Sequence, residues 1–383
     1  MPTQPASRPV RRPSSGRPKP LALCSVFLLT PEADAKLDGI SLRAALKADG
    51  REYLFKIFER VMRCQPGQSQ RQLIVQLDAL YPKGREVPPL LDLIRRAIYG
   101  DPVAISEAES VGLWQCWKAG LGERVPFHQR IAMDHAIEVE QACLAILADL
   151  RDKSFDRVAA AIAFDQRLRP YATDTALGCL TSATSEVTAL PARVACLCEF
   201  LLSQVARVDV AMQLRRGEKG SQSFSYLVGT DDGKRCTPGG NLIRWIQTRF
   251  GVVTLEGLLA LNAKGQAPAV IDESTLKRWS SDAVFPSGTK LGQLVLSVLK
   301  SRYDVGGVVQ AELTVIGAHY WAARRLHKVL QIARRLHAID RSADERIRWM
   351  QLMNDTTPET WCRRRYPLWI AHWQERDEVA SGT

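Results

Sequence analysis

The segment that most constrains the fold of this chain is the run 192–214, which follows Pro191 and is apolar on nearly every side of a helix. Proline is well tolerated in the first turn of a helix, so Pro191 is expected near its start. A helix that is apolar all round has no face to turn toward water, and it needs other elements around it. The sequence therefore predicts a central core helix surrounded by further helices.

Segments with helical periodicity flank this run on both sides. Apolar residues recur every three or four positions between about 30 and 190, and again beyond 241. This spacing is typical of amphipathic helices that bury one face. We therefore expect a mainly α fold, with an N-terminal helical domain over 21–214, a C-terminal helical domain over 241–300 and further basic helices over 301–383.

The composition changes between 215 and 240, where Gly, Ser and Lys replace apolar residues. Residues 224–228 have the composition of a strand, and Asp232-Gly233 is a good turn former ahead of a second short strand. We expect an exposed linker here, or a small β-hairpin near 223–237, and the main domain boundary of the chain.

The formal net charge of +11 is concentrated in two places. The first, residues 1–20, contains five basic and no acidic residues among many Pro and Ser, and is expected to be a disordered basic tail. The second, residues 320–349, contains eight basic residues and three acidic ones. Clustered charges of one sign repel each other, so these segments predict either a solvated face or a surface for an acidic partner.

The cysteines and the apolar segments bear on the compartment. Nine cysteines are scattered without the paired spacing of a zinc site, in apolar surroundings, which predicts buried reduced thiols in a cytoplasmic protein. The apolar run 21–29 follows a basic segment but is too short and wrongly placed for an export signal. No uninterrupted apolar stretch of about 18 residues occurs, so we expect no membrane partner.

Four short helices are predicted between 241 and 300. Thr254 and Asp272 are suited to cap the second and third of them, and Pro286-Ser287 opens the fourth. In the third helix, Leu276 and Trp279 lie three positions apart and are expected to face inward. The outward positions are Glu273, Ser274, Lys277, Arg278 and Ser281.

The run 274–281, followed by Phe285-Pro286-Ser287 and an amphipathic helix ending at Leu299, resembles the second half of Cro/repressor-type helix-turn-helix domains. The resemblance covers roughly 241–300 and implies a recognition helix in the major groove of DNA. It implies base contacts from the outward residues of the third helix, and phosphate contacts near Ser287 and Lys290. The connection between the second and third helices is about six residues longer than the family's tight turn.

A long basic helix is predicted over 311–339. Its apolar positions can form one buried side, and its basic residues would then spread over the rest and bind phosphates in a salt-dependent way. These basic residues are Arg324, Arg325, Lys328, Arg334 and Arg335. Near the C-terminus, Trp361, Trp369 and Trp373 are expected in the core rather than as stacking platforms for bases.

Motifs for phosphate-binding loops, dinucleotide binding, zinc proteases and serine hydrolases are all missing from the sequence. We therefore expect no catalytic residue, metal or cofactor. The leading hypothesis is a protein that binds double-stranded DNA, as a transcriptional regulator or a mobile-element-associated factor, and homo-oligomers are compatible with it. Two alternatives stay open: a helical adaptor for an acidic protein, and a nucleic-acid-processing enzyme whose site only the fold assembles.

Overall fold

The computed structural model describes most of residues 125–381, the segments 23–29 and 31–37, and scattered positions between 47 and 118. The gaps in the first range are 151–153, 217–223, 230–236, 266–270, 282, 304–305 and 341–351. The predicted tail 1–20 and most of the predicted helices between 38 and 122 therefore lie outside the described residues.

All regular structure in the described part of the chain is helical, which confirms the mainly α fold. The strand predicted at 224–228 is wrong. This segment forms the single helical turn α13 (Ser225–Val228), and Phe224 donates its backbone N–H to the buried carboxylate of Asp209 at 3.0 Å. No strand lies beside this segment in the described residues, so the Asp209 carboxylate serves as the acceptor for this amide, and Phe224 and Leu227 are buried. The second half of the proposed hairpin, 230–236, is outside the described residues.

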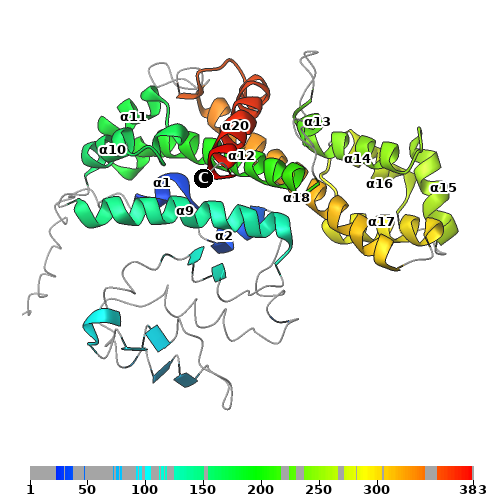
Figure 1. The fold of residues 1–383 in the computed structure, drawn as a ribbon. Helices are drawn as coiled ribbons and strands as arrows, with labels where there is room; N and C mark the ends of the chain where they lie inside the picture. The colour runs from blue at the N-terminus through cyan, green and yellow to red at the C-terminus, as the bar shows by residue number, and fades with distance from the viewer. Residues whose placement is uncertain are drawn as a thin grey trace, which may run out of the picture.

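The predicted central helix is confirmed as α12 (Glu186–Arg216), in which Pro191 lies within the first two turns. Residues 195–213 are buried almost without interruption. Helices from distant parts of the chain pack around α12, as Figure 1 shows for α9 on one side and α20 on the other. They are α1 (Cys24–Phe27), α9 (Phe127–Asp149), α11 (Asp174–Thr181), α18 (Gly306–Asp340) and α20 (Pro358–Ser381). Helix α10 (Phe155–Phe164) and the 3-10 turn η2 (Arg169–Tyr171) pack against α11 and α12 respectively.

A buried carboxylate joins α12 to α20. Glu199 is only 2 % exposed, and it accepts hydrogen bonds from the indole Nε1 atoms of Trp361 and Trp369, both at 2.9 Å. Arg365 donates to it from Nε at 2.9 Å, so the buried charge is fully paired. Trp373 is buried as well, which confirms that the three C-terminal tryptophans belong to the core.

A second group of helices lies beside this core (Figure 1). It consists of α14 (Pro238–Arg249), α15 (Leu255–Gly265), α16 (Glu273–Ser280) and α17 (Gly288–Arg302). The N-terminal part of α18 packs on α14 and α17, and its later part packs on α12 and α20. Helix α2 (Pro31–Leu37) joins α18 through a buried ion pair between Asp34 and Arg325. Helix α18 therefore belongs to both groups and links them.

The described cysteines are free thiols, and all but the partly buried Cys24 are buried, as predicted. Burial raises the pKa of the Cys179 thiol to about 11 and that of Cys196 to about 12, since a thiolate loses its hydration there. Among the helices described, none combines the length and the apolar composition needed to cross a bilayer.

Candidate nucleic-acid interface

The two-turn helix α16 is held in place at both ends and on its inner face. Asp272 is its N-cap: the carboxylate accepts the backbone N–H of Thr275 at 2.6 Å. Leu276 and Trp279 are 0 % and 3 % exposed, as predicted. At the C-terminal end, a Cβ on Gly240 of α14 would lie 2.4 Å from the carbonyl oxygen of Ser280. Only glycine permits this approach of α14 to α16, so the position of the short helix depends on that residue.

The outer face of α16 presents the predicted residues to solvent. Glu273, Ser274, Lys277, Arg278 and Ser281 are all exposed. Lys277 forms an ion pair with Glu273, one turn away in the helix. The hydrogen bond within this pair is the main reason that the pKa of Lys277 is raised, and the charge of Glu256 in α15 raises it slightly further. Arg278 has no carboxylate partner among the described residues. Among the described residues, this face therefore carries one guanidinium without a carboxylate partner and one ammonium that Glu273 balances.

The first turn of α17 brings Lys290 within electrostatic range of Asp272, the N-cap of α16. Ser287 is the N-cap of α17, and its hydroxyl accepts the backbone N–H of Lys290 at 3.2 Å. In this cap the Ser287 hydroxyl acts as an acceptor, so its own proton remains a donor for the predicted phosphate contact, together with the backbone amides beside it. Lys290 is exposed and close enough to Asp272 to contribute, after the cap hydrogen bonds, to the lowered pKa of that carboxyl.

The loop 283–287, which joins α16 to α17 along the chain, packs against the basic part of α18. The Phe285 ring lies 4.9 Å from that of His327 and 5.8 Å from that of Tyr320, measured between ring centroids. The Tyr320 hydroxyl donates to the Pro286 carbonyl at 3.1 Å, and Arg324 donates to that hydroxyl at 3.1 Å. The structure thus brings Arg324 next to the α17 start.

Three cations follow one another along α18. Arg324, Lys328 and Arg335 fall within about 40° of each other around the helix axis, given 100° per residue. Burial lowers the pKa of Lys328, and the like charges of Arg324 and Arg335 lower it further. The three residues therefore form a row of mutually repelling charges, which bound anions would relieve. We call Arg324, Lys328 and Arg335 the α18 row.

Two predicted contact residues face elsewhere. Arg325 is 1 % exposed, and its guanidinium forms a two-pronged pair with Asp34, with Nη2 and Oδ2 2.8 Å apart; the prediction that it contacts DNA is wrong. Arg334 pairs through Nε with Glu359 of α20 at 2.8 Å, so its charge is balanced within the fold. The reason is geometric, because neighbours in a helix differ by about 100° in direction.

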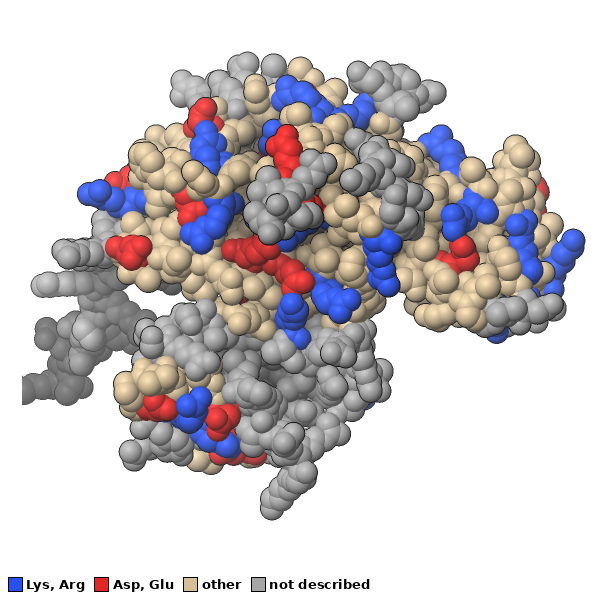
Figure 2. Space-filling model, in the orientation of Figure 1, with Lys and Arg blue, Asp and Glu red and all other residues tan. Residues whose placement is uncertain are grey.

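Figure 2 shows Lys and Arg side chains spread over the lobe formed by α14 to α17, with fewer acidic side chains between them. Sequence reasoning missed the residues that hold this lobe together. Gly240 carries no charge and matches no motif, and the contacts of Phe285 with Tyr320 and His327 could not be read from the sequence. The pair of Arg249 in α14 with Glu312 in α18, at 2.7 Å between Nη2 and Oε1, was missed too. Only Phe285, an apolar residue just before a helix start, left a signal in the sequence.

No family model, curated protein or solved structure matches the chain. The helix-turn-helix resemblance accordingly depends on residues 241–300 of this sequence and stays a prediction. Within the part of the chain that the structure describes, no cluster of three or more His, Cys, Asp or Glu side chains is arranged to hold a metal ion.

Proposed function

We propose that this protein binds double-stranded DNA, with the outer face of α16 in the major groove. The observation that carries the proposal is the construction of α16: a short helix fixed by a cap, by two buried side chains and by a glycine contact, whose polar face is open to solvent. A helix of this size fits the major groove, and its positioning has to be rigid for bases to be read.

The roles of the side chains follow from their surroundings. The Arg278 guanidinium has no carboxylate partner in the described part of the chain, and it can donate two hydrogen bonds to one guanine. The pair of Lys277 with Glu273 is solvent-exposed, and such pairs contribute little stability, so Lys277 can exchange its partner for a phosphate. Ser274 keeps acceptor capacity on its hydroxyl oxygen, because it donates its proton to Asp272 at 3.0 Å.

The DNA backbone would be held by Lys290 and the α18 row. Four phosphates neutralised there would release their counterions, and log Kd would then change by about 3 to 4 for each tenfold change in salt concentration. A regulator of transcription or a factor of a mobile element, acting in the cytoplasm, is the biological role that we propose for such a module.

The test is fluorescence anisotropy of the full chain with a labelled random-sequence duplex, at about 50 mM and about 200 mM salt. We expect binding at the lower concentration and much weaker binding at the higher one. The double variant Lys277→Ala, Arg278→Ala should bind at least tenfold more weakly. The matched control is Arg130→Ala, Arg157→Ala, which removes two exposed cations from α9 and α10 and should leave the affinity unchanged.

Absence of binding at low salt would refute the proposal, and so would equal losses in the two double variants. If DNA does not bind and the chain instead retains an acidic protein in a nuclease-treated pull-down, the adaptor hypothesis replaces it.

A further inference from the structure

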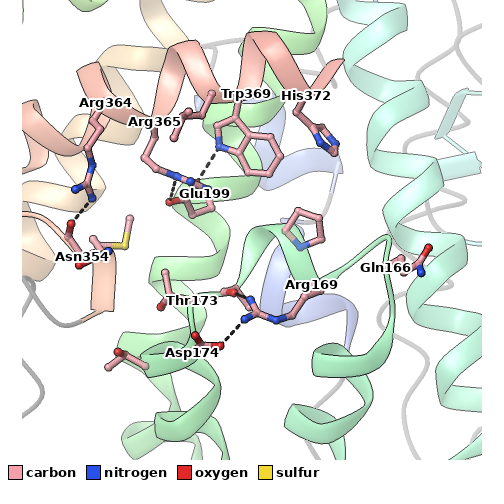
Figure 3. Close-up of a pocket in the computed structure, with 15 residues that line it drawn as sticks. Gln166, Arg169, Thr173, Asp174, Glu199, Asn354, Arg364, Arg365, Trp369 and His372 are labelled. Atoms are coloured by element: carbon pink, nitrogen blue, oxygen red, sulfur yellow. Dashed lines mark hydrogen bonds and ion pairs between the residues drawn. The ribbon is translucent and has the colours of Figure 1, made fainter. Parts of the chain in front are cut away.

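A cavity of about 1060 Å³ lies in the α12 core, away from the helices of the proposed DNA interface. Its walls are α20 on one side and the segment 166–175 on the other, with Glu199 of α12 between them (Figure 3). Sites for small molecules have volumes of roughly 300 to 1,000 Å³, so this cavity is large enough for a metabolite. None of the proposed DNA-contacting residues lines it.

Guanidinium groups approach the cavity from both walls. Arg364 and Arg365 belong to α20, and Arg169 belongs to η2 opposite (Figure 3). Each of them is fixed by a carboxylate: Arg364 pairs with Asp355 at 3.1 Å, Arg365 with Glu199, and Arg169 with Asp174. Because these pairs hold the arginine side chains before any ligand arrives, little conformational entropy is lost on binding.

The guanidinium groups of Arg364 and Arg365 have N–H donors that these ion pairs do not use. Arg365 uses only its Nε on Glu199, at 2.9 and 3.1 Å, and both of its Nη groups have no acceptor among the described residues. Arg364 uses Nε and Nη2, which donates to the Asn354 carbonyl, and keeps Nη1. Each guanidinium has five N–H groups, of which Arg365 uses one and Arg364 two, so seven donors on this wall have no acceptor among the described residues.

The two acidic residues of the lining, Glu199 and Asp174, are each paired with an arginine of the cavity. Glu199 is enclosed by two indole N–H groups and the Nε of Arg365, so its charge is spent inside the core. The N-terminus of the eight-residue helix α11 also lines the cavity through residues 173–175. The helix dipole there favours an anion, and the carboxylate of Asp174 in this first turn is paired with Arg169.

Apolar side chains line the space between the charged walls. Leu368 is 54 % exposed, and Pro170 and Met353 also border the cavity. The ring of Trp369 is covered on one side by Tyr171, stacked at 5.3 Å, and Arg365 lies 5.4 Å from its centroid. A ligand would therefore place an apolar part on Leu368 and Pro170 rather than stack on the indole.

We propose that this cavity binds a small organic phosphate. The phosphate oxygens would accept hydrogen bonds from Arg364 and Arg365, and the organic part would lie against Leu368. Seven donors on one wall exceed what the two oxygens of a carboxylate need, whereas the three oxygens of a phosphate monoester can accept more of them. The proposal does not rest on DNA binding.

The test is isothermal titration of the full chain with phenyl phosphate, ribose 5-phosphate and AMP, together with inorganic phosphate and succinate. We expect one-to-one binding of at least one organic phosphate, at least tenfold tighter than inorganic phosphate or succinate. Arg364→Gln should weaken it at least tenfold; Arg364 is half exposed, so the fold should survive. Arg157→Gln removes an exposed charge from α10 and should change nothing.

A second variant tests the contact with the organic part of the ligand separately from the phosphate contacts. Leu368→Ser should weaken the organic phosphate several-fold and leave inorganic phosphate unaffected. The proposal is overturned if no probe binds, if succinate binds as tightly as the phosphates, or if Arg364→Gln and Arg157→Gln behave alike.

Discussion

Replacing Gly240 by alanine is the sharpest test of how α16 is positioned. An added Cβ would lie 2.4 Å from the carbonyl oxygen of Ser280 and 3.3 Å from its carbonyl carbon, both of them backbone atoms. Ordinary contacts begin near 3.4 Å, so α14 and α16 would have to separate by about 1 Å. Because the contact would be with backbone atoms, no side-chain rotation could relieve it.

The expected magnitude follows from two opposing effects. Overpacking of this kind costs about 1 to 3 kcal/mol, while alanine in a helix gains up to about 1 kcal/mol over glycine. We therefore expect Gly240→Ala to lower the free energy of unfolding by about 1 to 2 kcal/mol in urea titrations. Because the shift moves α16, DNA affinity in the anisotropy assay should fall as well.

Gly292 of α17 is the matched control. It is also a helical glycine, but a Cβ there would meet nothing within 4 Å. Gly292→Ala should raise the free energy of unfolding by about 0.5 to 1 kcal/mol, because alanine restricts the unfolded chain. If Gly240→Ala is as stable as Gly292→Ala and binds DNA equally well, the close approach does not position α16.

Two further predictions concern the core. Glu199→Ala leaves two indole N–H groups and the Nε of Arg365 without an acceptor, so the free energy of unfolding should decrease by about 3 to 5 kcal/mol in urea titrations. Glu199→Gln keeps one oxygen, so its free energy of unfolding should lie between those of Glu199→Ala and the wild type. Glu186 is exposed, so Glu186→Ala should lower the free energy of unfolding by less than about 1 kcal/mol. An equally small loss for Glu199→Ala would show that the hydrogen bonds to Glu199 do not stabilise the fold. Burial lowers the pKa of His128 to about 4, whereas the unfolded chain takes up this proton near pH 6.5. Stability should therefore decrease as the pH drops from 6.5 toward 4. Between about pH 7 and about pH 5, the free energy of unfolding of His128→Phe, measured in urea, should decrease by about 2 kcal/mol less than that of the wild type. If both proteins show the same pH dependence, His128 is not responsible for it.

Much of the local structure could be predicted because it depends on residues three or four positions apart. Thr254 accepts the N–H of Gly257 at 3.0 Å, and Asp272 caps α16 in the same way, both as expected from their types. The inward direction of Leu276 and Trp279 followed from helical spacing. The exposed face of α16 was correct for the same reason.

The set of phosphate contacts was predicted less well. The sequence predicted that five basic residues would spread over the exposed sides of α18 and bind phosphates. The structure keeps Arg324, Lys328 and Arg335 together, while Arg325 and Arg334 form ion pairs within the fold. Asp34, the partner of Arg325, lies 291 positions away in the chain. No pattern within the helix could indicate that partner, because it comes from another part of the sequence.

The sequence by itself determined which segments are helical, where several of them begin and which helix is central, because backbone hydrogen bonds, caps and apolar periodicity act over short distances along the chain. Only the tertiary structure decided that α20 returns to α12 around Glu199, that Phe224 joins a helical turn at Asp209, and that arginines from two walls meet at one cavity. These outcomes depend on packing and charge pairing between distant segments, and such pairing exists only once the chain has folded.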